Sequence, residues 1–196
     1  GEFRDHGGVE LISDTEACNL RDGYLARVHS ISGALECFVD KTPDNFKYLE
    51  LIFNVFPQAK IIHCRRQPLA TALSVYFKLF DGLAYSNNLD TIAQYYVKYQ
   101  QYIEHHNKRY EGSWLDVDYE DLVLDPVNIT QQLSKFLDCE IAPLGSSTLQ
   151  PKQTSINTMS KWQARQSIYQ NSLNRWHRYE PHLKSLKNQL AAFLSD

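Results

Sequence analysis

Two adjacent arginines, Arg65 and Arg66, stand between a short apolar run and a segment with helical periodicity. The start of a helix attracts anions through its backbone N–H groups and its dipole, and a guanidinium adds bidentate pairing to phosphate oxygens. Ser74 follows on the same predicted helix and could donate its hydroxyl to that anion. These residues indicate a phosphate site, although a bare Arg-Arg-x-Pro sequence also fits two solvated arginines at the end of a strand.

A second cation, Lys41, directly follows another apolar run, within the sequence VDKTP. A positioned ammonium group at such a place could neutralise charge on a leaving phosphate or on a group in transfer. A surface lysine in a turn is the commoner fate of a single lysine, so Lys41 alone does not identify a site.

These side chains need elements that position them. Three short apolar runs bounded by turn residues predict buried strands, at residues 35–39, 59–64 and 114–117. Apolar periodicity predicts helices over residues 15–31, 45–56, 68–80, 89–110, 129–137 and 183–194. Strands alternating with helices favour a three-layer α/β fold with a parallel sheet. Ligands in such sheets bind beyond the carboxyl ends of the strands, so we expect Lys41 and Arg66 at one edge.

The composition is that of one globular domain, which we expect to span residues 1–196. A net charge of −3 argues against a broad cationic surface, so we expect neither a nucleic-acid partner nor a membrane partner. The four scattered cysteines predict reduced thiols, most of them in the core, and a cytoplasmic location. No apolar run approaches the roughly 20 residues that a transmembrane helix needs.

Other polar residues have simpler interpretations. His105, His106 and His177 lack a second cluster at metal-ligand spacing, so we expect no metal site. Four tyrosines recur at helical spacing between residues 95 and 102, which is more typical of core and rim than of a stacking surface. The acidic residues at 116, 118, 120 and 121 are interpreted as caps and solvated edges.

Five blocks of the sequence resemble the sulfotransferases, in the order in which that family carries them. The blocks are FVDKTPDNF at 38–46, FPQAKIIHCRRQP at 56–68, SVYF at 74–77, VDYEDLV at 117–123 and SLNRWHRY at 172–179. They are most similar to the bacterial type that carries tetratricopeptide repeats ahead of the catalytic domain, which is related to the tyrosylprotein sulfotransferases. The resemblance implies transfer of a sulfuryl group from 3′-phosphoadenosine 5′-phosphosulfate to a hydroxyl or amine, without a metal. The acceptor stays open between a peptide tyrosine, a carbohydrate and a small metabolite.

The resemblance also implies roles for particular residues. Arg66 and Ser74 match the arginine and serine that bind the 3′-phosphate of the sulfate donor. Lys41 matches the lysine near the bridging oxygen, where it assists the transfer. Tyr119 resembles a tyrosine near the nucleotide.

Three further positions follow from the same resemblance. Ser160 and Arg175 fall close to C-terminal residues that contact donor phosphates in the family. Glu2 is a candidate for the base that deprotonates the acceptor, because a glutamate follows the donor loop in the tyrosylprotein relatives.

One family feature has no counterpart here, namely the first strand and the Pro-Arg-Ser-Gly-Thr-Thr-like loop that binds the 5′-phosphosulfate. We therefore expect a partial catalytic domain of the P-loop sulfotransferase type, a fragment whose isolated chain is inactive. Two alternatives stay open. A nucleotide kinase would carry a Gly-x-x-x-x-Gly-Lys loop upstream and depend on magnesium. A non-catalytic nucleotide-binding module would keep Arg66 and Ser74 but lack any upstream loop.

Overall fold

The computed structural model describes residues 12–33, 37–78, 80, 82–142 and 173–194. The chain divides into two compact units, the first from residues 1–61 and 103–113 and the second from residues 62–102 and 114–196. Each unit is described by itself below. The expectation of one domain over residues 1–196 stays a prediction.

Helix α1 (Asp14–Ser32) opens the described part of the first unit. A capping box starts it, because the amide of Glu16 donates to Ser13 Oγ at 3.3 Å and the amide of Ser13 donates to Glu16 Oε2 at 2.9 Å. Gly33 ends it with a φ of 75°, a conformation that favours glycine. The helix predicted at residues 15–31 is confirmed.

The next predicted helix is confirmed in two parts, the 3₁₀ turn η1 (Asn45–Tyr48) and α2 (Leu49–Val55). Leu49 and Val55 are buried on α2, and Pro57 prevents the helix from continuing. Within the same unit, the Phe53 ring stacks on the Tyr110 ring with centroids 3.8 Å apart.

The buried strand predicted at residues 35–39 is wrong over its described part. Residues 37–39 form no strand, Val39 is 83% exposed and Phe38 is 37% exposed. A strand exists only through hydrogen bonds to a neighbouring strand, and no described strand pairs with this segment. An apolar run of this length fits an exposed loop equally well.

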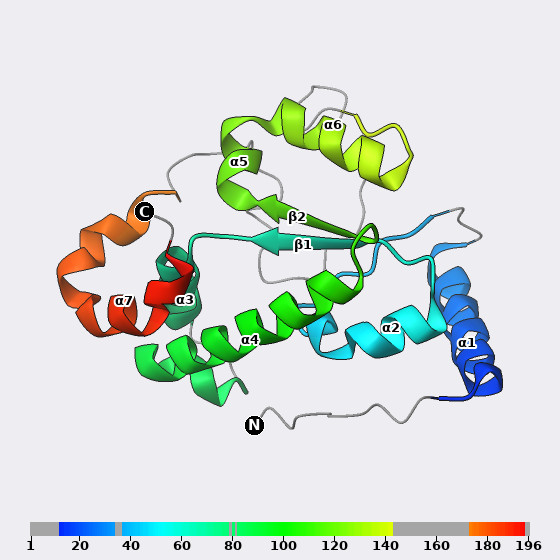
Figure 1. Cartoon of the computed structure of the whole chain (residues 1–196), viewed down its shortest axis with the longest axis horizontal. Coiled ribbons are helices and arrows are strands. Elements are labelled where there is room, and N and C mark those ends of the chain that lie inside the picture. The colour runs from blue at the N-terminus through cyan, green and yellow to red at the C-terminus, as the bar shows by residue number, and fades with distance from the viewer. Residues whose placement is uncertain (1–11, 34–36, 79, 81, 143–172, 195–196) are drawn as a thin grey trace. The chain divides into compact units, whose positions relative to one another are not determined.

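The sheet has two strands in the described part of the chain, β1 (Ile61–Arg65) and β2 (Trp114–Asp118). Both predicted strands are therefore confirmed. His63 faces Asp116 and Arg65 faces Asp118, so both strands advance together and the pairing is parallel. The two arrows of Figure 1 point the same way. This confirms the α/β class, whereas the three-layer arrangement stays a prediction.

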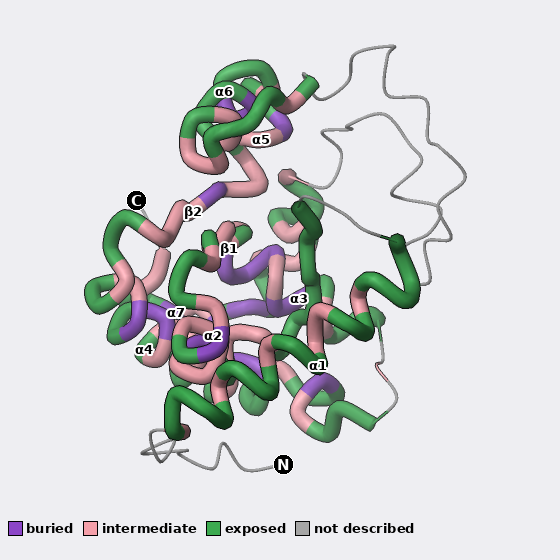
Figure 2. Tube along the Cα trace, turned by 90° about the vertical axis from the view of Figure 1, so that its right-hand side faces the viewer, coloured by how far each residue is buried: buried purple, intermediate pink, exposed green. Residues whose placement is uncertain are grey.

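The core of the second unit joins three helices, α3 (Pro68–Lys78), the first part of α4 (Leu89–Arg109) and α7 (Lys184–Leu190). Figure 2 colours buried residues purple along the trace. The buried residues of this core are Leu69, Ala72, Leu73, Ile92, Ala93, Tyr96, Leu183, Leu186 and Leu190. Full burial of one leucine stabilises the fold by about 1.5–3 kcal/mol. This core anchors α3, the helix that follows the arginine pair.

Two helices follow β2, α5 (Tyr119–Leu124) and α6 (Pro126–Leu137). Asp125 caps α6 by accepting from the amide of Asn128 at 3.1 Å, and Pro126 occupies the first turn. The C-terminal part begins with the 3₁₀ helix η5 (Arg175–His182), which the sequence did not predict. Short 3₁₀ turns η2 (Ala84–Asn87) and η6 (Ala191–Phe193) complete the unit. No helix in the described ranges has the length and apolar character needed to span a bilayer.

The four cysteine thiols are free, as predicted, but all of them are exposed. The prediction of core thiols is therefore wrong. Cys18 lies on α1, which has no buried residue, and Cys37 lies in the segment that forms no strand. An apolar neighbourhood in the sequence does not bury a side chain unless the element itself is covered.

Candidate functional site

The arginine pair lies at the corner between β1 and α3, and Arg65 pairs with carboxylates on the neighbouring strand β2. Its guanidinium donates to both carboxylate oxygens of Asp118, at 3.0 and 2.6 Å, and to Asp116 Oδ2 at 3.1 Å. The hydrogen bonds to Asp118, together with the charge of both aspartates, raise the pKa of Arg65 although burial opposes the shift. Arg65 is thus neutralised by two carboxylates on β2, which makes it a poor ligand for an added anion.

Arg66 takes a different direction from its neighbour. The centre of its guanidinium lies 5.0 Å from the centroid of the Tyr119 ring, which begins α5. A guanidinium over an aromatic face is attracted by the ring quadrupole, and its planar fork of N–H groups has the geometry for bidentate pairing to a phosphate. Two of the residues predicted to contact the nucleotide are therefore brought together, and Arg66 is the arginine suited to an anion.

Side chains already occupy amides at the start of α3. The amide of Gln67 donates to Glu120 Oε1 at 3.1 Å, and the amide of Ala70 donates to the side-chain oxygen of Gln67 at 2.7 Å. Pro68 has no N–H group to offer. An anion at this corner consequently depends on side chains more than on the backbone donors that the sequence led us to expect.

Ser74 is exposed on α3, and the structure places Arg175 beside the next turn of that helix. The guanidinium of Arg175 lies 5.8 Å from the Phe77 ring centroid. The Tyr179 ring supports Phe77 from η5, with centroids 5.0 Å apart. Residues three apart share a helix face, so Ser74 and Phe77 present a hydroxyl and an aromatic ring on one side of α3.

Lys41 belongs to the first unit, where it lies exposed just before η1. The preceding carboxylate, Asp40, accepts hydrogen bonds from the Tyr24 hydroxyl and from Asn45 Nδ2, the latter at 3.0 Å. Burial, the hydrogen bond and the charge of Asp40 raise the pKa of Tyr24 to about 12. These contacts hold the turn that carries Lys41. Because Arg66 lies in the other unit, the pairing of the two cations stays a prediction.

The last two predicted site residues, Glu2 and Ser160, lie outside the described residues. Their proposed roles as base and phosphate ligand stay predictions. Among the residues that the structure describes, no group of His, Cys, Asp and Glu side chains is arranged to hold a metal ion.

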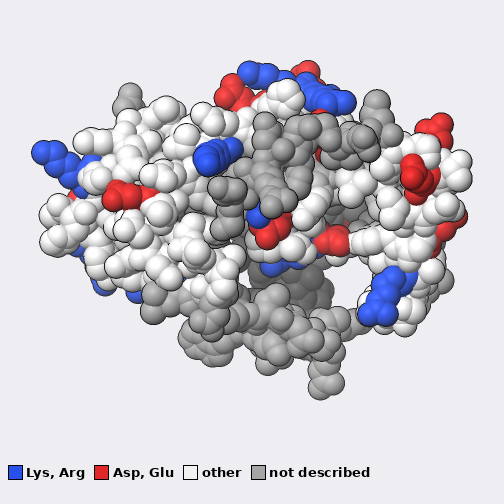
Figure 3. All heavy atoms as spheres, turned by 90° about the horizontal axis from the view of Figure 1, so that it is seen from below, with Lys and Arg blue, Asp and Glu red and all other residues white. Residues whose placement is uncertain are grey.

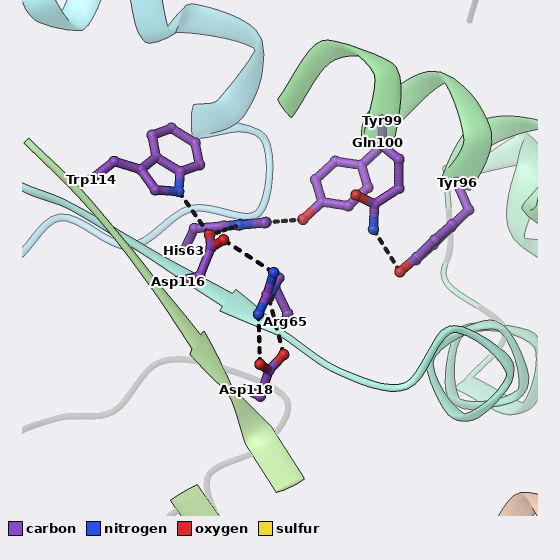
Figure 4. A network of polar contacts seen from close by, with 8 residues as sticks. All are labelled: His63, Arg65, Tyr96, Tyr99, Gln100, Trp114, Asp116 and Asp118. Carbon is purple, nitrogen blue, oxygen red and sulfur yellow. Dashed lines mark hydrogen bonds and ion pairs between the residues drawn. The ribbon is translucent and has the colours of Figure 1, made fainter. Parts of the chain in front are cut away.

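A partly buried polar network that includes Arg65 joins the two strands to α4 (Figure 4). Asp116 Oδ1 lies 2.8 Å from His63 Nδ1 and accepts from Trp114 Nε1 at 2.7 Å. The second ring nitrogen of His63 contacts the Tyr99 hydroxyl. Burial opposes ionisation of Asp116, but its bonds to Trp114 and His63 and the charge of Arg65 together hold its pKa below the ordinary value.

The sequence interpretation missed this network, since it assigned Asp116 and Asp118 to caps and solvated edges. A signal was present. His63 and Arg65 alternate on one predicted strand as Asp116 and Asp118 do on the other, and residues two apart on a strand face the same side. Complementary charges with equal spacing on two parallel strands indicate direct pairing across the sheet.

We expect this network to make the fold sensitive to mild acid. Burial holds the pKa of His63 below its ordinary value of 6.5, despite the nearby Asp116. Below about pH 6.5 the unfolded chain therefore binds more protons, so the stabilisation is complete above that pH and is lost as the pH falls through the folded-state value. Urea unfolding between about pH 5 and pH 7.5 measures the effect.

The His63→Gln variant provides the test of that assignment. It should flatten the dependence of the unfolding free energy on pH in this range, because the amide cannot titrate. The His182→Gln variant removes an exposed imidazole of the same unit and should keep the dependence of the parent chain. A His63→Gln variant with an unchanged slope would contradict the assignment.

On the face drawn in Figure 3, lysine and arginine side chains are interspersed with aspartate and glutamate among the described residues. No continuous cationic patch covers the described part of that face, in agreement with the net charge of −3.

Comparison with known proteins gives two findings. Residues 11–143 match the family described as "Sulfotransferase family". An uncharacterized protein of Aquifex aeolicus (strain VF5) is 32% identical over 166 residues, which cover 82% of this chain and 21% of that protein. The family match includes Lys41, Arg66, Ser74 and Tyr119, whereas Arg175 lies beyond it.

Proposed function

Because the chain belongs to the sulfotransferase family, we propose that it carries the 3′-phosphate side of the donor site in an enzyme that uses 3′-phosphoadenosine 5′-phosphosulfate. The enzyme transfers the sulfuryl group to a hydroxyl or amine of its acceptor. The transfer forms an S–O or S–N bond to the acceptor and breaks the S–O bond to the 5′-phosphate. A base takes the acceptor proton, and adenosine 3′,5′-bisphosphate leaves.

The observation that carries this proposal is that the two adjacent arginines have different partners. Two aspartates of β2 neutralise Arg65, while Arg66 lies over Tyr119 at the start of the adjacent helix. A guanidinium beside an aromatic ring offers both pairing to a phosphate and a flat surface for a nucleoside. Ser74 on α3 would add the hydroxyl donor, and Arg175 beside Phe77 a second cation.

The transfer step needs stabilisation of the charge that builds on the leaving phosphate. Lys41 is the residue assigned to that task, because an ammonium near the bridging oxygen stabilises the transition state more than the ground state. Glu2 is the assigned base. Arg66 and Ser74 would act earlier, by holding the 3′-phosphate so that the donor is aligned for in-line attack.

Calorimetric titration of the chain tests the proposed site directly. Adenosine 3′,5′-bisphosphate should bind at least about tenfold more tightly than adenosine 5′-monophosphate, because only the first ligand has a 3′-phosphate for Arg66. Transfer of labelled sulfate from the donor by the full-length protein tests the reaction. If the chain and the full-length protein both bind the bisphosphate and the monophosphate with equal affinity, the assignment of the β1–α3 corner to the 3′-phosphate is wrong.

A further inference from the structure

The parallel register of the sheet continues beyond the strand ends into the corner. Arg65 pairs with Asp118, the Arg66 guanidinium lies over Tyr119, and the amide of Gln67 donates to Glu120. Three consecutive residues of the β1–α3 junction thus contact three consecutive residues of the β2–α5 junction, one to one. We call these two facing segments, residues 65–67 and 118–120, the junction clamp.

Each contact of the junction clamp acts on a different kind of group. Asp118 binds a side-chain guanidinium, Tyr119 offers a ring face, and Glu120 accepts from the backbone. The side chain of Gln67 then turns back to the amide of Ala70, which ties the same residue to the first turn of α3. The backbone of Arg66 is therefore fixed on both sides. Asp118 binds the preceding residue, Arg65, and Glu120 accepts from the amide of the following residue, Gln67.

A carboxylate beside an anion site is costly, because like charges at a few ångströms repel each other. Its presence needs a compensating contact, and the hydrogen bond from the Gln67 amide supplies one, since a carboxylate accepts from a backbone N–H more strongly than a neutral oxygen does. The bond also consumes an amide at the start of α3 that an anion would otherwise meet. The Gln67 amide therefore does not bind the nucleotide directly. Its bond to Glu120 instead fixes the backbone at this position.

We infer that Glu120 is a positioning residue for the 3′-phosphate site, because its carboxylate fixes the backbone of Gln67 and so directs the Arg66 guanidinium. Glu120 does not itself contact the nucleotide. This inference rests on the proposed function, since it supposes that Arg66 binds the 3′-phosphate. It assigns to the β2–α5 junction a part in selecting 3′-phosphorylated nucleotides.

Two conservative variants of Glu120 distinguish the effect of side-chain length from the effect of side-chain charge. Glu120→Gln keeps a side-chain oxygen at the same reach and removes the repulsion between the Glu120 carboxylate and the phosphate, so it should bind adenosine 3′,5′-bisphosphate at least as tightly as the parent chain. Glu120→Asp keeps the charge but is one methylene shorter, so it should lose the Gln67 bond and bind the bisphosphate about tenfold more weakly. Both variants should bind adenosine 5′-monophosphate as the parent chain does, a selectivity that a merely structural role would not produce. Titration calorimetry with the two nucleotides gives these values.

Asp121→Asn is the matched control, because it removes an exposed carboxylate from the first turn of the same helix. It should leave the affinity for both nucleotides unchanged. If Glu120→Asp binds the bisphosphate like the parent chain, or Glu120→Gln binds it about tenfold more weakly, the positioning role is overturned while the proposed function stands. If the parent chain itself does not prefer the bisphosphate, the proposed function fails and the inference fails with it.

Discussion

Replacing Arg66 with alanine is expected to weaken the binding of adenosine 3′,5′-bisphosphate about 100-fold. A bidentate pair between a guanidinium and a phosphate is worth roughly 2–3 kcal/mol, and alanine removes both of its hydrogen bonds. The Tyr119 ring would remain, so stacking of the nucleoside should persist. Adenosine 5′-monophosphate should therefore lose less than threefold in affinity, as measured by titration calorimetry.

The control for this variant is Lys135→Gln, which removes one positive charge from an exposed position on α6 in the same unit. It should change the affinity for the bisphosphate less than twofold, because a screened surface charge contributes little. Equal losses in the two variants would mean that net charge, and not Arg66, determines binding. An Arg66→Ala chain that binds like the parent would remove the central ligand from the proposed site.

Replacing Asp116 with alanine is expected to lower the free energy of unfolding by about 3 kcal/mol. Its carboxylate contacts His63, Arg65 and Trp114, and its side chain is 26% exposed. Alanine would leave these groups without their acceptor in a poorly hydrated place, and part of the Arg65 charge would lose its compensation. Urea unfolding followed by tryptophan fluorescence measures the change.

Two companion variants define what that loss means. Asp116→Asn keeps one oxygen as an acceptor and should cost less than Asp116→Ala. Asp121→Ala removes an exposed carboxylate from α5 and should stay within about 0.5 kcal/mol of the parent chain. If Asp116→Ala were as stable as the parent chain, the network of Figure 4 would not stabilise the sheet.

Both sets of expectations follow from the different positions of the neighbouring residues Arg65 and Arg66. Arg65 ends β1 with its side chain on the side of the sheet that Asp116 and Asp118 share, so it closes a polar network. Arg66 lies one residue further on, beyond the strand, where the chain turns into α3. Successive residues of an extended chain point to opposite sides, which explains why adjacent arginines acquire different partners.

The sequence by itself determined the local elements of this protein and the family to which it belongs. Strands β1 and β2, and most helices, followed from apolar periodicity and from breakers such as Gly33 and Pro57, because these signals act within a few residues. The family could be inferred from five motif blocks, and residues 11–143 match it. The role of Arg66 as an anion ligand is predicted from its motif and stays a prediction.

Only the tertiary structure decided what those residues contact. Asp116, Asp118 and Glu120 are more than 50 residues from the β1–α3 corner along the chain, so nothing local distinguished them from solvated carboxylates. The strand expected at residues 35–39 failed for the same reason, because a strand depends on a neighbour that the segment itself does not specify. Pairing between distant segments, which the sheet register sets, separates the structural Arg65 from the proposed ligand Arg66.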